Sequence, residues 1–148
     1  MSLHQLDPDW IVPDWPAPPG IRAVCTTRAG GVSPGGYASL NLGDHVGDVP
    51  ADVAANRERL ARAIDARPVF LQQVHGTGLA VLDAGMADGV QADAACTAEQ
   101  GLACTVMVAD CLPVLFTDAQ GHRVAAAHAG WRGLPAGVLA RAVQWFDR

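Results

Sequence analysis

Two short apolar runs, each followed within two residues by a chemically reactive residue, limit what this 148-residue chain can fold into. Cys111 comes just after the run 105–109, and His128 closes the run 124–127. Apolar runs of this length, bounded by turn-forming residues, are typical of buried strands. The pattern therefore predicts reactive side chains at strand ends, where a rigid sheet can aim them into a common site.

A third reactive residue, His75, ends the run 69–74 in the same way. His75, Cys111 and His128 together offer two imidazoles and one thiolate, a ligand set of catalytic zinc sites. The sequence intervals are 111 − 75 = 36 and 128 − 111 = 17 residues, so the ligands would come from separate strands. Three other interpretations stay open: a metal-free pair with Cys111 as nucleophile and His128 as base, a copper site, and ordinary core residues.

The remaining pattern predicts an α/β fold with a mixed sheet packed with helices. The clearest helix is 50–65, which begins with proline and carries an apolar stripe. A second helical pattern runs over 134–146. The expected strands are 21–27, 69–75 and 79–83 joined as a hairpin, 105–109, 113–117 and 123–128, with Pro113 ending the pairing beside Cys111.

Composition excludes several classes of protein. Hydrophobic residues make up 50% of the chain and charged residues 17%, as in a folded protein, and the length suits one domain, 1–148, with a proline-rich segment at 1–20. The net charge of -5 gives no support to a nucleic-acid partner. No apolar run approaches the roughly 18 residues of a membrane span. The absence of a signal-peptide pattern predicts a cytoplasmic protein whose four cysteines are thiols or ligands.

All ten basic residues are arginines, which excludes a lysine nucleophile, a Schiff base and a P-loop lysine. Anions must then be held by arginine, backbone N–H groups or a metal. Arg28 opens the glycine-rich segment 28–37, which is either an anion-holding loop or an ordinary surface loop. Asn41 follows it as either a turn former or a site residue.

Five separate motifs carry a resemblance to a known family: TTRAGGVSPGGYASLNLGDHVGD, FLQQVHG, QADAACT, MVADCLPVLF and AAAHAGWRG. In this order they resemble the YfiH family, also called the polyphenol oxidase or laccase-domain family and the peptidoglycan editing factor family. The resemblance runs from about residue 22 to the end of the chain. It implies zinc bound by His75, Cys111 and His128, and an α/β fold likened to bacterial deamidating toxins with a Cys-His pair.

The resemblance implies a cytoplasmic purine nucleoside phosphorylase acting on adenosine, inosine, guanosine and methylthioadenosine, with adenosine deaminase activity. Purine nucleosides and phosphate would be its partners. We expect Arg28, Asn41 and Arg132 to hold phosphate or ribose, and Asp93 to orient a ligand or move a proton beside Cys111 and His128. Asp93 and Arg132 also suit purely structural roles.

Members of the family usually continue for roughly a hundred residues beyond the last motif, so we expect this chain to be a C-terminally shortened form. Unpaired strands in such a form favour homo-oligomers. Two further interpretations stay open. One is a cysteine hydrolase acting on peptidoglycan precursors, and the other is an interaction module without enzymatic turnover. A polyphenol-oxidase-like copper protein is the less favoured metal alternative, because five histidines are too few for a four-copper centre.

Overall fold

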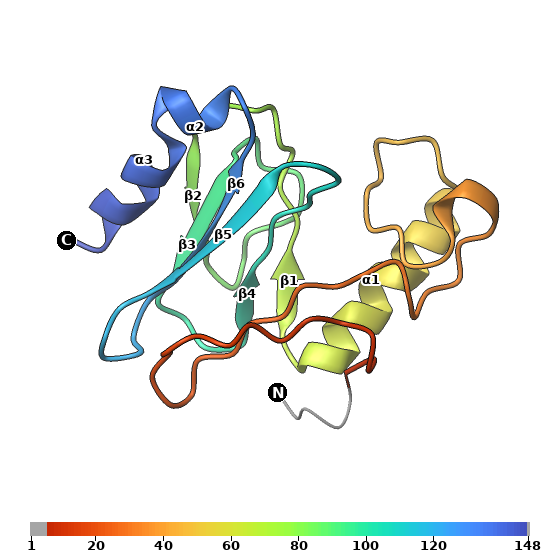
Figure 1. Cartoon of the computed structure of the whole chain (residues 1–148), viewed down its shortest axis with the longest axis horizontal. Coiled ribbons are helices and arrows are strands. Elements are labelled where there is room, and N and C mark those ends of the chain that lie inside the picture. Colours follow the sequence, from red (N-terminus) through yellow and green to blue (C-terminus); the bar gives the residue numbers. More distant parts are fainter. Residues whose placement is uncertain (1–5, 148) are drawn as a thin grey trace. The chain divides into compact units, whose positions relative to one another are not determined.

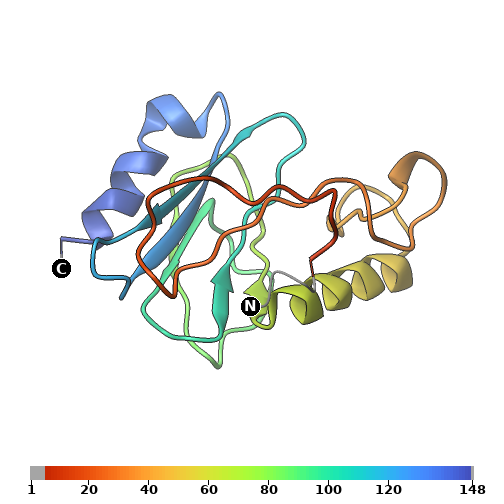
Figure 2. The same ribbon diagram turned by 60° about the horizontal axis from the view of Figure 1, so that its bottom comes forward.

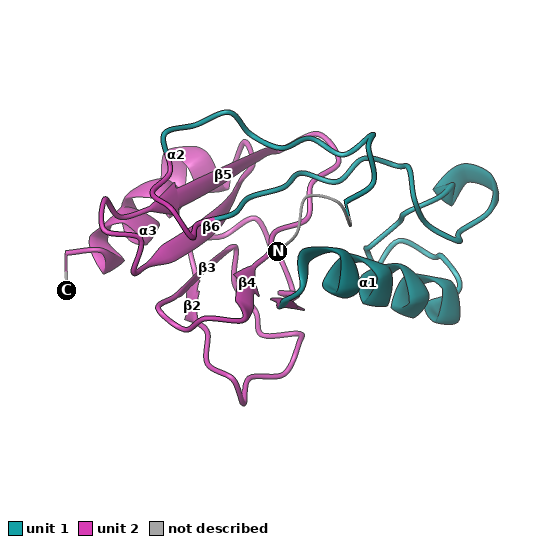
Figure 3. Cartoon of the chain, turned by 90° about the horizontal axis from the view of Figure 1, so that it is seen from below, with its two compact units in different colours: residues 1–16, 22–66 teal, residues 17–21, 67–148 magenta. Residues whose placement is uncertain are grey.

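The computed structural model describes residues 6–147 and divides the chain into two compact units (Figure 3). Unit 1 comprises residues 1–16 and 22–66, and unit 2 comprises residues 17–21 and 67–148. The first five residues of the proline-rich segment lie outside the described residues. Over the described range, no helix combines the length and the apolar character that a membrane crossing requires.

Unit 1 is built around the helix α1, Pro50–Ile64, which confirms the helix expected at 50–65. Proline suits the first turn because its missing N–H has no partner there in any helix. The helix ends where Asp65 adopts the left-handed conformation, with φ of 50°. Three residues of the expected apolar stripe are buried, namely Val53, Leu60 and Ile64.

The other described residues of unit 1 form loops, apart from the short 3-10 helix η2, Gly35–Tyr37. The expected strand 21–27 is wrong, because only Cys25 forms a β-bridge there, with Ile11. The segment that carries Ile11 also contains Pro8, Pro13 and Pro16. Prolines have no N–H to donate, so a longer ladder cannot form between the two segments.

Unit 2 contains two sheets (Figure 1). The larger sheet has the strand order β2-β3-β6-β5, formed by β2 Leu79–Val81, β3 Ala94–Thr97, β6 Val124–Ala129 and β5 Leu112–Thr117. Strands β2 and β3 are parallel, whereas β3–β6 and β6–β5 are antiparallel. The smaller sheet pairs β1, Arg67–Val69, in parallel with β4, Leu102–Cys104. The expected α/β fold with a mixed sheet is confirmed.

The helices α2, Gly133–Ala136, and α3, Val138–Trp145, follow β6 directly and lie along the larger sheet (Figure 2). Alternate residues of a strand face opposite sides, so Ala94 and Ala127 pack against Val138 of α3. Ala95 packs on the other side, in a cluster with Val69 of β1. The alanine-rich strands let the helix approach the sheet closely.

Several expectations about unit 2 are wrong. The strand expected at 69–75 does not form, because β1 ends at Val69 and His75 lies in a turn. No hairpin joins this region to 79–83, because β1 and β2 belong to different sheets. No strand forms at 105–109, where the backbone of Met107 bonds to the Gln73 side-chain amide instead of to a neighbouring strand. Nε2 of Gln73 donates to the Met107 carbonyl oxygen and its Oε1 accepts from the Met107 N–H, both at 2.7 Å. The helical pattern at 134–146 is divided by Gly137, whose φ is 101°.

Pro113 does not end the pairing beside Cys111, contrary to expectation. It lies within β5, where it pairs with His128 of β6. The larger sheet ends at β5, so this strand needs hydrogen bonds on one side only. An edge strand tolerates proline for that reason.

Candidate metal centre

The register of β5 and β6 brings Cys111 and His128 to the same face of the sheet. Pro113 lies opposite His128, and Leu112 lies opposite Ala129. Cys111, one residue before β5, is therefore opposite Gly130. Because side chains alternate along a strand, Cys111 shares a face with Pro113, and so with His128.

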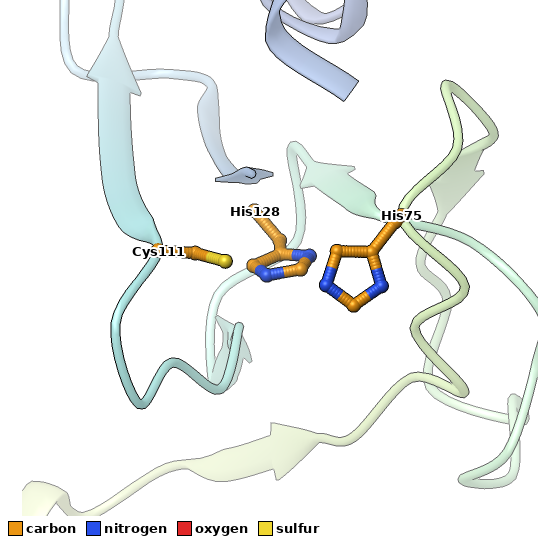
Figure 4. Close-up of side chains that lie close together, drawn as sticks. All are labelled: His75, Cys111 and His128. Carbon is orange, nitrogen blue, oxygen red and sulfur yellow. The ribbon is translucent and has the colours of Figure 1, made fainter. Parts of the chain in front are cut away.

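His75 completes the group from a turn between β1 and β2. The ligand atoms of His75, Cys111 and His128 all lie within 4.8 Å of one another. The two imidazole rings meet edge to face, with centroids 4.9 Å apart. Figure 4 shows the three side chains pointing toward one another from separate segments of the chain. His128 is buried, Cys111 is half-buried and His75 is exposed, so the group is open to solvent on the His75 side.

Asp93 anchors this group from β3's side of the sheet. The backbone N–H of His128 donates to the Asp93 carbonyl oxygen at 2.7 Å, which continues the β3–β6 ladder. The side chains also meet, with Oδ2 of Asp93 2.7 Å from Nδ1 of His128. Cross-strand neighbours on one face of a sheet come into contact in this way.

The Asp93 carboxylate also holds the turn that carries His75. It accepts hydrogen bonds from the backbone N–H groups of Val74, His75 and Gly76, each at 2.9 Å. The turn requires φ of 60° at His75, a conformation that few non-glycine residues adopt. Burial of the carboxylate opposes ionisation, but the hydrogen bonds from His128 and from these N–H groups outweigh it. The pKa of Asp93 consequently lies below its ordinary value.

Gly130 leaves the space that two of the clustered side chains occupy. A Cβ atom at this position would lie 3.0 Å from Cδ2 of His75 and 3.2 Å from Sγ of Cys111. Both distances are shorter than ordinary van der Waals contacts. Sequence reasoning missed this residue, although its place two residues after His128, within the motif that carries it, was a usable signal.

The donor set fits a zinc ion. Two imidazoles and a thiolate are borderline and soft ligands that zinc binds in open catalytic sites, with a fourth position left for substrate or solvent. Burial and the negative charge of Asp110 raise the pKa of the Cys111 thiol. A cation held beside the sulfur would reverse this effect, because metal binding favours the thiolate.

Three other expected site residues lie outside this group. Arg28 and Asn41 belong to unit 1, whereas the three ligands belong to unit 2. Nε of Arg28 donates to the Ala38 carbonyl oxygen, and the Asn41 side chain bonds to Gly43 and Asp48 within a turn. Arg132 is exposed and stacks on the Trp131 ring at 4.8 Å.

Asn56 is a buried polar residue that sequence reasoning did not single out. Its Oδ1 accepts from the Val32 N–H, and its Nδ2 donates to Ser33 Oγ and to the Asn41 carbonyl oxygen. It therefore ties the middle of the glycine-rich segment 28–37, and Asn41 beyond it, to α1. A polar residue inside an apolar helical stripe was the available signal.

Comparison with known proteins places these features in a family. Residues 22–148 match the family described as multi-copper polyphenol oxidoreductase laccase. A purine nucleoside phosphorylase of Pseudomonas aeruginosa is 56% identical over 130 residues, which cover 88% of this chain and 53% of that protein. The purine nucleoside phosphorylase YfiH of Escherichia coli is 51% identical over 138 residues, covering 92% of this chain and 57% of that protein.

Solved structures agree with this assignment. A Neisseria meningitidis protein of 46% identity superposes with a TM-score of 0.87, covering 94% of this chain and 57% of that one. A Bacillus licheniformis protein named YfiH, 31% identical, superposes with a TM-score of 0.75, covering 83% of this chain and 51% of that one. The chain spans about half the length of the relatives it matches. With a His-Cys-His group on a shared fold and identities near one half, this chain belongs to the YfiH, or laccase-domain, family.

Proposed function

We propose that this chain carries the metal centre of a zinc-dependent purine nucleoside phosphorylase. The observation that carries the proposal is the convergence of His75, Cys111 and His128, whose ligand atoms lie within 4.8 Å of one another. The names of relatives about 50% identical support purine nucleosides and phosphate as substrates. The proposal includes adenosine, inosine, guanosine and methylthioadenosine as nucleosides, adenosine deamination as a second activity, and a cytoplasmic location.

The chain's own residues would bind and orient the reactants. Bound zinc would supply Lewis acidity at neutral pH. In phosphorolysis a phosphate oxygen bonds to the ribose C1′ as the bond from C1′ to the purine nitrogen breaks, and the departing purine needs stabilisation of its negative charge. His75 is the exposed member of the group, so a substrate would approach from its side.

Arg28, Asn41 and Arg132 are the proposed phosphate and ribose contacts. Each can donate to an anion or a hydroxyl group, and arginine suits phosphate because its guanidinium donates two parallel hydrogen bonds. Arg132 follows His128 by four residues and is exposed beside Trp131, which could stack on a purine. In unit 1, Arg28 and Asn41 border the loop that Asn56 holds against α1.

A cysteine hydrolase is the second candidate, supported by one further observation. The structure places a possible nucleophile, base and orienting carboxylate in contact: Cys111 lies beside His128, and Nδ1 of His128 bonds to Asp93. Asp93 and His128 are therefore proposed catalytic residues in this alternative. The raised pKa of the Cys111 thiol argues against it, because thiolates are the nucleophiles.

The test measures metal content and turnover on the same preparation. Protein purified without added metal is analysed by elemental mass spectrometry, beside Cys111→Ala and the control Cys25→Ala. Cys25 is an unpaired, half-buried cysteine of unit 1, outside the metal group. We expect about one zinc per chain in wild type and Cys25→Ala, and none in Cys111→Ala, since two imidazoles alone bind zinc weakly.

Turnover then separates the candidates. Release of free base from inosine that needs phosphate and stops on chelation supports the proposal. Hydrolysis that survives chelation but stops on thiol alkylation would replace it with the cysteine hydrolase. Copper in place of zinc would show that the proposed metal is wrong. A folded chain with neither bound metal nor turnover would overturn both enzyme proposals.

A further inference from the structure

Asp93 lies behind the metal group rather than in it. Its side chain is fully buried, immediately before β3, and the three clustered ligand residues do not include it. A buried carboxylate is costly unless hydrogen bonds satisfy its oxygens. The arrangement of those hydrogen bonds therefore shows what this carboxylate does.

All four observed partners of the carboxylate are nitrogen atoms. Oδ1 accepts from the N–H groups of Val74 and Gly76, and Oδ2 accepts from the His75 N–H and lies 2.7 Å from Nδ1 of His128. An ionised carboxylate can only accept hydrogen bonds. The hydrogen bond to His128 thus requires a proton on Nδ1.

This requirement decides which nitrogen of His128 can bind a metal. A neutral imidazole with its proton on Nδ1 has its lone pair on Nε2. His128 Nδ1 is occupied by Asp93, so Nε2 is the atom that can bind a metal ion together with His75 and Cys111.

The same carboxylate controls a second ligand through the backbone. His75 needs φ of 60°, and the three N–H groups of residues 74–76 converge on the two Asp93 oxygens. A turn in a rarely populated conformation persists only when its surroundings hold it. His75 is otherwise an exposed residue, so these contacts fix the backbone from which its ring projects.

We propose that Asp93 is a positioning residue that sets two of the three ligands at once, through the Nδ1–H tautomer of His128 and through the backbone turn of His75. The inference rests on the proposed metal centre for its function. The four nitrogen partners of the carboxylate, all within hydrogen-bond distance, are the environment that an ionised carboxylate needs.

Zinc affinity of the Asp93→Asn variant is the first test, by competition with a coloured chelator. In one orientation, asparagine places its NH₂ group against the His75 N–H and Nδ1 of His128, which both bond to Oδ2. In the other orientation, the NH₂ group meets the N–H groups of Val74 and Gly76, which bond to Oδ1. We expect zinc affinity to fall by about 10-fold or more, as for other residues that orient metal-binding histidines.

Asp118→Asn is the matched control for a loss of fold. The Asp118 carboxylate also accepts backbone N–H groups, from His122 and Arg123, but it lies in the β5–β6 turn away from the ligands. Its zinc affinity should equal that of wild type. Equal weakening in both variants, or none in Asp93→Asn, would overturn the proposal.

The second test needs no variant, so it stands even if Asp93→Asn fails to fold. Two-bond ¹H–¹⁵N correlation spectra of metal-free wild type at pH 8 report the protonated nitrogen of each histidine. We expect Nδ1–H at His128, and Nε2–H or an even mixture would overturn the inference. A chain with Nδ1–H but no zinc binding would disprove the metal function alone, whereas zinc binding with Nε2–H would disprove the positioning role alone.

Discussion

At the residue scale, the metal group depends on small side chains as much as on its ligands. Gly130 faces both His75 and Cys111, and Gly133 comes close to the Gly76 carbonyl oxygen, 3.0 Å from an added Cβ. These glycines let two loops and the end of β6 approach one another. The motif that carries His128 therefore supplies glycines that allow close packing as well as a metal ligand.

Gly130→Ala should weaken zinc binding while leaving the fold intact. Its added methyl group would displace the His75 ring or the Cys111 sulfur by a few tenths of an ångström, and metal sites need close to ideal ligand placement. We expect roughly a 10-fold loss of zinc affinity, on the scale reported for other perturbed ligand shells. Titration with a competing chelator, with circular dichroism on the same samples, would measure both effects.

Gly36→Ala is the control for the added methyl group. A Cβ at Gly36 meets no atom within 4 Å, and the residue lies in the short helix η2. Its zinc affinity should match wild type. Unchanged affinity in Gly130→Ala would mean that the ligands lie farther from this backbone than the contacts indicate.

At the element scale, α3 closes the far side of the sheet that presents His128. Val138 is fully buried against Ala94 and Ala127, while Val143 of the same helix is 46% exposed. Helix α3 therefore carries one valine in the buried core and another at the exposed surface.

Val138→Ala should lower the free energy of unfolding by roughly 2 kcal/mol, since it removes buried methyl groups and leaves a cavity. Val143→Ala should change it by less than about 0.5 kcal/mol, as is usual for surface substitutions. Urea unfolding monitored by tryptophan fluorescence would measure both. Equal effects would show that the helix is not packed on the sheet as described.

The elements that sequence reasoning predicted are those with local signals. Helix α1 has proline at its start and a periodic stripe, and β6 is a continuous apolar run. The strand expected at 105–109 failed because a side-chain amide, Gln73, satisfies the backbone there. No local sequence pattern reveals that a side chain will bond to a backbone segment so far along the chain.

In the metal group too, some features have local sequence signals and others depend on contacts between distant segments. The three ligands were predicted from residue type and expected strand ends, and the resemblance strengthened the choice. The common face of Cys111 and His128, however, follows from the register of β5 and β6, and His75 joins them from a turn. Asp93 was expected from sequence to orient a ligand or move a proton, but its contacts with His128 required knowledge that β3 pairs with β6. Pairings between distant segments are not encoded in local periodicity, so neither fact was accessible from sequence.

At the scale of the whole molecule, the three ligands belong to one of two compact units. His75, Cys111 and His128 are all in unit 2, and α1 is in unit 1. Ligand binding stabilises the folded state of the part that binds, by about 2.7 kcal/mol at a free concentration of one hundred times Kd.

Zinc should therefore protect backbone amides in unit 2 selectively. Hydrogen–deuterium exchange with and without zinc should slow at residues 74–76, whose N–H groups bond to Asp93, and remain unchanged along α1. The Cys111→Ala variant should show no such slowing. Equal protection of α1 would mean that the two units unfold together.

The long intervals between the ligands also bear on the order of events in folding. Gaps of 111 − 75 = 36 and 128 − 111 = 17 residues mean that an unfolded chain offers no ready chelate. In the folded chain the donors meet through the β5–β6 pairing and the turn that carries His75. A metal that binds only this folded arrangement should lengthen the lifetime of the folded chain by slowing unfolding. It should have little effect on the rate of folding.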